Sequence, residues 1–161
     1  MKYSNSQLFW LVALRVFIGW HFLHEGVVKL ANPNWSSIGY LMDSQGIMKN
    51  FFYSLAANPT ALSVIDFLNV WGLIGIGLGL IIGIFTNISV VSGIILLALY
   101  YFSHPPIVGI KYSLPMEGSY LFVNKNLIEM AALIVLLVFP TGRHIGLDRL
   151  IFSSKNKNRN H

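Results

Sequence analysis

Long apolar runs separated by shorter polar segments dominate the pattern of this chain. The runs cover residues 7–30, 61–85, 88–103 and 124–139. An α-helix rises about 1.5 Å per residue, so the first run extends about 36 Å, enough to cross a hydrocarbon core of about 30 Å. The pattern predicts an all-α integral membrane protein, a four-helix bundle that forms a single domain over residues 1–152.

The first apolar run carries five ionisable side chains, at Arg15, His21, His24, Glu25 and Lys29. Ionisable groups cost roughly 2.5 to 3.5 kcal/mol each at the centre of a bilayer. Helical periodicity gathers four of them on about one third of the helix surface and leaves His24 outside it. A membrane helix with one polar face needs polar partners on neighbouring helices.

The later runs supply such partners at the same depth of the bundle. Successive helices alternate in direction, so the end of the first helix meets the start of the second and of the fourth. The polar residues at those starts are Asp66, Asn69, Lys125, Asn126 and Glu129. Three basic and three acidic side chains then balance one another, with Arg15 expected at the floor of the cluster.

Two interpretations of this cluster are open. It is either an ion-pair network that only fixes helix packing, or a polar pocket that binds a small polar headgroup or passes protons. The sequence H-x-x-H-E from His21 to Glu25 is a weak signal for metal or haem, because no second pair of ligands accompanies it. A histidine beside a carboxylate is better suited to shuttling protons, so we expect no metal site.

Two longer loops separate the helices. Residues 31–60 contain Asn-Pro breaks and several aromatic residues, which predicts short interfacial helices near 36–44 and 47–56. Residues 104–123 form a second loop on the same side. The second helix has a row of glycines at a spacing that allows close helix contact in lipid. These are Gly75, Gly79 and Gly83.

Composition agrees with a membrane protein and narrows the chemistry. Of 161 residues, 55% are hydrophobic and 11% are charged, whereas soluble domains average about 25% charged residues. Cysteine is absent, which excludes disulfides and thiol chemistry carried by this chain. Five of the eleven basic residues lie in the last 19 residues. They predict a basic, disordered cytoplasmic tail at 153–161 rather than nucleic-acid binding, with both termini cytoplasmic in a bacterial inner membrane.

Several short motifs, spread over most of the chain, carry a family resemblance. They are R-x-x-x-G at 15–19 with His24-Glu25-Gly26 and Lys29, WGLIGIGLGLIIGIFT at 71–86, LYYFSHPP at 99–106, EGSYLFVNKNLIE at 117–129 and FPTGRHIGLDRL at 139–150. Together they resemble the DoxX/DoxD family of small four-helix membrane proteins. The resemblance implies a membrane subunit linked to oxidoreductases, such as the thiosulfate:quinone oxidoreductase that passes electrons from thiosulfate to quinone.

We therefore predict a quinone-interacting membrane subunit, with quinone as a substrate and a protein partner that supplies electrons. A homo-oligomer stays open. The residues expected to handle protons are His21, His24, Glu25 and Glu129. Those expected to bind the quinone are Arg15, Lys29, Asp66, Asn69, Lys125 and Asn126. The alternative is a non-catalytic scaffold or assembly partner for a redox or envelope enzyme. A transporter is less favoured, because four helices without a repeat leave little room for alternating access.

Overall fold

The computed structural model describes residues 3–107, 109–110, 112–113 and 121–150. Its helices are α1 (Asn5–Ala31), α2 (Ile38–Met42), α3 (Lys49–Ala57), α4 (Pro59–Ile82), α5 (Thr86–Ser103) and α6 (Lys125–Val138). The described residues contain no strand, and the expected all-α bundle with two short helices in the first loop is confirmed. The predicted basic tail at 153–161 lies outside the described residues.

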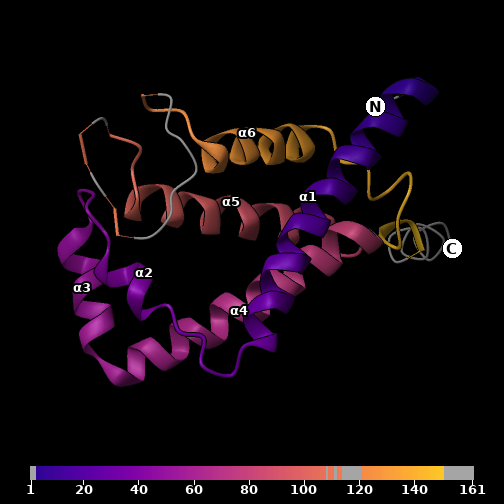
Figure 1. Ribbon diagram of the computed structural model, residues 1–161. Coiled ribbons are helices and arrows are strands. Elements are labelled where there is room, and N and C mark those ends of the chain that lie inside the picture. The colour runs from indigo at the N-terminus through magenta and orange to yellow at the C-terminus, as the bar shows by residue number, and fades with distance from the viewer. Residues whose placement is uncertain (1–2, 108, 111, 114–120, 151–161) are drawn as a thin grey trace, which may run out of the picture.

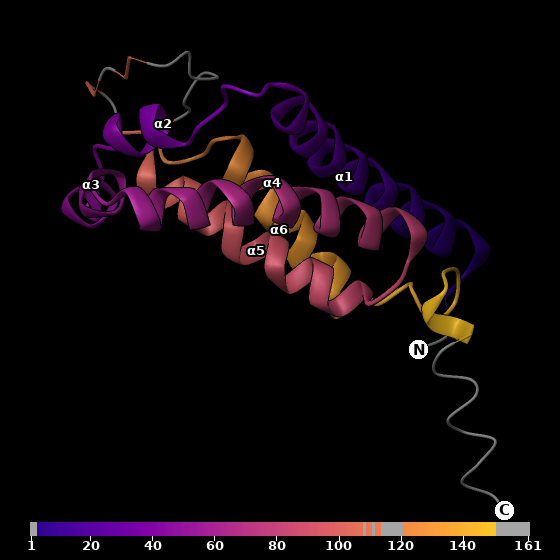
Figure 2. The ribbon, with the colours of Figure 1, turned by 90° about the horizontal axis from the view of Figure 1, so that it is seen from below.

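Four helices form the bundle, and they alternate in direction along the chain (Figure 1). α1 packs along α4, and α5 packs along α6. The short helices α2 and α3 lie at one end of the bundle, which we call the loop end (Figure 2). The N-terminus and residues 141–150 lie together at the opposite end, which we call the terminal end.

The bundle helices differ in length. Among the described residues, α1, α4 and α5 are long and apolar enough to cross a membrane. Helix α6 has 14 residues. It therefore extends only about 21 Å, which is less than a hydrocarbon core of about 30 Å. The bundle thus combines three full-length helices with a fourth, shorter one that packs against α5.

Local sequence determines where these helices begin and end. Ser4 starts α1 with a capping box. Asn58 caps α4 through its side chain, and Pro59 occupies the first helical turn, where its missing N–H leaves no bond unmade. Asn124 caps α6 in the same way. Helix α4 ends at Gly83, whose φ of +73° is a left-handed conformation that glycine adopts without strain.

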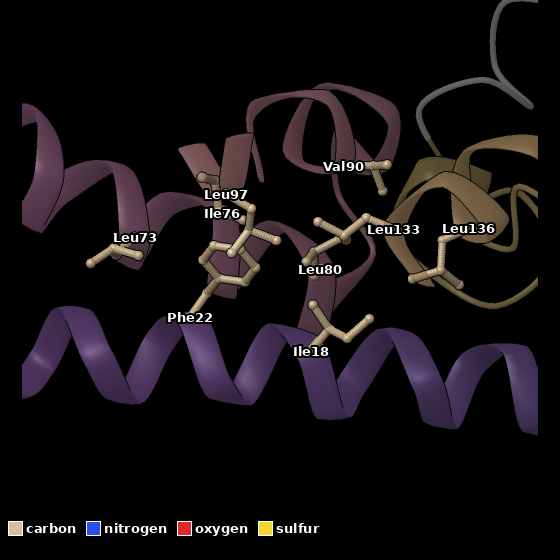
Figure 3. Packing of buried hydrophobic residues seen from close by; sticks show 9 residues of the cluster. All are labelled: Ile18, Phe22, Leu73, Ile76, Leu80, Val90, Leu97, Leu133 and Leu136. Atoms are coloured by element: carbon tan, nitrogen blue, oxygen red, sulfur yellow. The ribbon is translucent and has the colours of Figure 1, made fainter. Parts of the chain in front are cut away.

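The core of the bundle is built from apolar side chains of all four helices (Figure 3). Ile18 and Phe22 point from α1 toward the other three helices. Leu80 of α4, Val90 of α5 and Leu133 of α6 are fully buried among them. Lipid is as apolar as these side chains, so close packing rather than removal from water stabilises the contact.

Glycines allow α1 and α4 to approach closely. A Cβ atom added at Gly77 of α4 would lie 2.5 Å from the backbone nitrogen of Leu23. Cβ atoms at Gly19 and Gly26 of α1 would likewise collide with α4. These three glycines therefore form the close seam between the two helices.

The predicted glycine row is placed differently. A Cβ atom at Gly75 would meet nothing within 4 Å, whereas one at Gly79 would collide with Ser89 at the start of α5. Gly83 ends the helix. The row therefore makes close contacts at Gly79 and Gly83 but not at Gly75, and the face of α4 that meets α1 is offset from it and includes Gly77.

Candidate functional site

A cavity of about 520 Å³ lies at the loop end of the bundle, and we call it the polar cavity. Phe22, Leu73 and Leu97 line it with apolar surface. The remaining lining residues come from α1, the segment 35–40, α4, α5 and the start of α6. They are His21, Glu25, Lys29, Trp35, Ser36, Ser37, Gly39, Tyr40, Asn69, Tyr100, Asn124, Lys125 and Asn126.

A histidine–carboxylate pair links α1 to α6 beside the cavity. His21 Nδ1 lies 2.7 Å from Glu129 Oε1. The Glu129 side chain is only 10% exposed, whereas that of His21 is 32% exposed and lines the cavity. The second oxygen of Glu129, Oε2, is buried and has no hydrogen-bond partner among the described residues. The pair therefore offers a short proton path between the cavity and a buried carboxylate.

A second polar group lies about two turns further along α1. Lys29 Nζ donates a hydrogen bond to Asn69 Oδ1 at 2.9 Å, and Asn69 Nδ2 donates to the hydroxyl oxygen of Tyr100 at 2.7 Å. The ammonium also lies 5.0 Å from the ring centre of Trp35 and 5.7 Å from that of Tyr100. Aromatic faces attract cations, so hydrogen bonding and ring contacts together hold Lys29 at the cavity wall.

Asp66 fixes the chain segment that closes one side of the cavity. Its Oδ1 atom accepts hydrogen bonds from both the backbone N–H and the hydroxyl of Ser37, at 2.8 and 2.5 Å. Ser37 lines the cavity, whereas Asp66 is absent from its lining. The carboxylate therefore positions the wall rather than facing the cavity.

Helix α2 forms part of the cavity wall, and Tyr40 anchors it to the C-terminal end of α5. The Tyr40 hydroxyl donates to the Tyr100 carbonyl at 3.3 Å, and its ring stacks on His104 with a centroid distance of 4.0 Å. His104 is 1% exposed, and its Nε2 lies 3.6 Å from Asp43 Oδ2. Burial raises the pKa of Tyr40, an effect that Tyr100 and Tyr112 reinforce, so this phenol stays protonated. Burial lowers the pKa of His104, and the Asp43 carboxylate opposes that shift.

Arg15 lies away from the cavity, toward the terminal end. It is 2% exposed; its Nη1 donates to Thr141 Oγ1 at 3.1 Å and its Nη2 donates to the Ile145 carbonyl at 2.8 Å. Nearby, the Asp148 carboxylate accepts hydrogen bonds from the first backbone N–H groups of α5. These contacts attach residues 141–150 to the bundle, and the structure does not bring Arg15 to the floor of the cavity.

Most of the predicted site residues meet at the polar cavity. Those that line it are His21, Glu25, Lys29, Asn69, Lys125 and Asn126. Glu129 reaches it through His21. Three lie elsewhere: Arg15 binds residues 141–145, Asp66 binds Ser37, and His24 is exposed and absent from the lining.

Sequence reasoning missed the aromatic residues of the wall and one of its amides. Trp35, Tyr40, Tyr100 and Asn124 line the cavity, although none is charged and none lies on the polar face of α1. The available signal was their position, since each lies near the loop end of a helix. Among the described residues, no three His, Asp or Glu side chains come together in a group that could hold a metal ion.

These features define a small helical membrane protein with a polar cavity at one end of its bundle. Residues 10–105 match the family model named DoxX. The match covers more than half of the chain, and the chain therefore belongs to the DoxX family. The matched range includes every residue of the polar cavity except those at the start of α6. Glu129 also lies outside the matched range. No curated protein and no solved structure matches the chain.

Proposed function

We propose that this protein is the quinone-interacting membrane subunit of an oxidoreductase, and that the polar cavity binds the quinone headgroup. The volume of about 520 Å³ lies within the range of small-molecule sites, roughly 300 to 1,000 Å³. A mixed lining of this kind suits an amphiphilic ligand: apolar side chains contact a ring, and polar groups contact its oxygens.

The observation that carries the proposal is the pair formed by His21 and Glu129. Reduction of a quinone to a quinol consumes two electrons and two protons. Imidazole and carboxylate groups in contact are a common means of moving protons, and His21 faces the cavity while Glu129 lies behind it. In this proposal the pair delivers protons to the bound headgroup.

Electrons come from a protein partner, because this chain contains no cysteine to carry thiol chemistry. We place the protein in a bacterial inner membrane with both termini in the cytoplasm. The basic residues near the terminal end, Arg143 and Arg149, and those of the tail support this orientation, since cytoplasmic segments of membrane proteins are enriched in Lys and Arg.

The test compares Glu129→Gln and Lys29→Met with wild type, in membranes and after detergent purification. We expect saturable quinone binding by the wild type, and loss of quinone-dependent turnover in both variants while each remains folded in the membrane. Lys49→Met is the matched control, because Lys49 contacts Tyr53 and lies outside the cavity lining. Unchanged turnover in Glu129→Gln would rule out the proposed proton path.

A further inference from the structure

The hydrogen bonds that join Lys29, Asn69 and Tyr100 have a defined direction. A lysine ammonium can only donate, so the atom of Asn69 that faces Lys29 must be the amide oxygen. The amide nitrogen of Asn69 then faces the Tyr100 hydroxyl, 2.7 Å away, and donates to it. The charge of Lys29 thus determines that the Tyr100 oxygen acts as an acceptor within the wall.

This arrangement leaves the Tyr100 hydroxyl proton available. Within the described part of the chain, no hydrogen bond is donated by this hydroxyl, although Tyr100 lines the polar cavity. Glu25 also lines the cavity, but no hydrogen bond joins its carboxylate to Tyr100 in the described residues. The proton is therefore available to an acceptor atom of a bound ligand.

The tyrosine is also held in place. Tyr40 packs edge-on against its ring at a centroid distance of 5.6 Å and donates a hydrogen bond to its carbonyl oxygen. The Lys29 ammonium lies 5.7 Å from the centre of the same ring. A donor that is fixed before the ligand arrives loses little conformational entropy on binding.

We propose that the Tyr100 hydroxyl donates a hydrogen bond to a carbonyl oxygen of the quinone headgroup. Asn69 and Lys29 are positioning residues that keep this hydroxyl a donor. The inference rests on the proposed function and adds the residue that recognises the oxidised headgroup, whose carbonyl oxygens can only accept hydrogen bonds.

The first experiment measures the Kd of menadione and decylubiquinone for the detergent-purified protein. Tyr100→Phe removes only the hydroxyl, and we expect its Kd to rise about 3- to 10-fold, the usual value of one hydrogen bond. Tyr101→Phe is the matched control. Its hydroxyl donates to the Phe122 carbonyl and Tyr101 is absent from the cavity lining, so its Kd should equal that of wild type.

A second variant tests the direction of the hydrogen bonds. Asn69→Asp preserves the shape of the side chain and still pairs with Lys29, but its second oxygen would accept the Tyr100 proton. We expect it to weaken binding as much as Tyr100→Phe does, and the double variant to bind no worse than either single variant. Additive losses would show that Asn69 does not act through Tyr100.

The infrared carbonyl stretch of the bound quinone separates recognition from mere packing. It should lie below its unbound frequency in wild type and return toward that frequency in both variants, with thermal unfolding verifying the fold. If wild type binds no quinone, the proposed function fails and the inference with it. If wild type and Tyr100→Phe bind equally well, with the same carbonyl frequency, only the role of Tyr100 is refuted.

Discussion

Arg15 shows how a single buried charge in a membrane helix can serve the fold instead of the site. Its position on the polar face of α1 groups it with His21 and Lys29, but it lies about 9 Å below His21 along the helix axis. At that depth its guanidinium reaches Thr141 and Ile145, which come from a segment 126 to 130 residues further along the chain. Its hydrogen bonds replace those that water would supply.

We predict that Arg15→Met destabilises the protein by about 2 to 3 kcal/mol, because two hydrogen bonds from a buried charged group are lost. Quinone binding at the polar cavity should persist under conditions where Arg15→Met is folded, because Arg15 does not line the cavity. Thermal unfolding in detergent measures the change, with Arg149→Met as the control. Arg149 is exposed, and its loss should cost no more than about 0.5 kcal/mol. Equal stability of Arg15→Met and wild type would contradict the structural role.

The sequence was sufficient to identify the charged members of the cavity but not its aromatic wall. His21, Glu25 and Lys29 share one helical face, and that periodicity is visible without a structure. Tyr100 and Trp35 have no such pattern, because their place at the cavity depends on how α5 and the segment after α1 are positioned in three dimensions. Asp66 illustrates the same limit, since its partner Ser37 lies in a loop.

At the level of elements, glycines bring α1 and α4 into close contact, and two glycines of α4 make this seam testable. Gly77→Ala places a methyl group against the backbone of Leu23, and we predict a loss of about 1 to 3 kcal/mol. Gly75→Ala lies two residues away in open space, and it should leave stability unchanged or raise it by up to about 1 kcal/mol through helix propensity. Chemical or thermal unfolding in the same detergent compares the two. Equal effects would show that the seam is looser than the structure describes.

The stability of the contact between α2 and the C-terminal end of α5 should depend on pH. His104 is buried at the end of α5, and the ionisable groups that face it are Asp43, Tyr40 and Tyr112. Burial lowers its pKa from the ordinary 6.5, despite the opposing carboxylate. The folded state therefore prefers the neutral imidazole, and its stabilising contribution is complete above pH 6.5. That contribution is lost as the pH falls below 6.5 toward the folded-state pKa, because the unfolded chain then binds the proton more readily.

We predict that acidification from pH 7.5 to 5.0 lowers the stability of wild type more than that of His104→Gln. The difference can reach about 1.4 kcal/mol for each pH unit between the two pKa values. Other histidines titrate in the same range, so the measurement is the difference between the two proteins in melting temperature against pH. Parallel curves would exclude His104 as the source.

Helix positions were easier to predict than helix contacts. The apolar runs at 61–85 and 88–103 correspond to α4 and α5, because Asn58, Pro59 and Gly83 mark the ends in the sequence itself. The glycine row of α4 indicated close packing but not its direction, since several faces of one helix carry glycine. Which face of α4 meets α1 depends on how all four helices of the bundle pack together.

For the molecule as a whole, the topology is determined by where the first and the last described residues of the chain lie. Helix α6 is too short to cross the hydrocarbon core by length alone, yet residues 141–150 reach the terminal end near the start of α1 (Figure 2), where the rings of Tyr3 and His144 are in contact. The Arg15 hydrogen bonds to Thr141 and Ile145 secure them there. Both ends of the described chain therefore lie at the terminal end of the bundle, opposite α2.

The absence of cysteine makes this arrangement directly measurable, because a single introduced thiol is the only one in the chain. Ser6→Cys and Arg149→Cys place exposed thiols at the terminal end, and Gly39→Cys places one at the loop end, where a Cβ meets nothing within 4 Å. The basic residues at the terminal end favour the cytoplasm. We therefore predict that a membrane-impermeant maleimide labels Gly39→Cys in intact spheroplasts, but labels the other two only after permeabilisation. The reverse labelling pattern would show that the protein has the opposite orientation, with the cavity facing the cytoplasm. Different responses of Ser6→Cys and Arg149→Cys would contradict the bundle itself, since the buried Arg15 contacts require both ends on the same side.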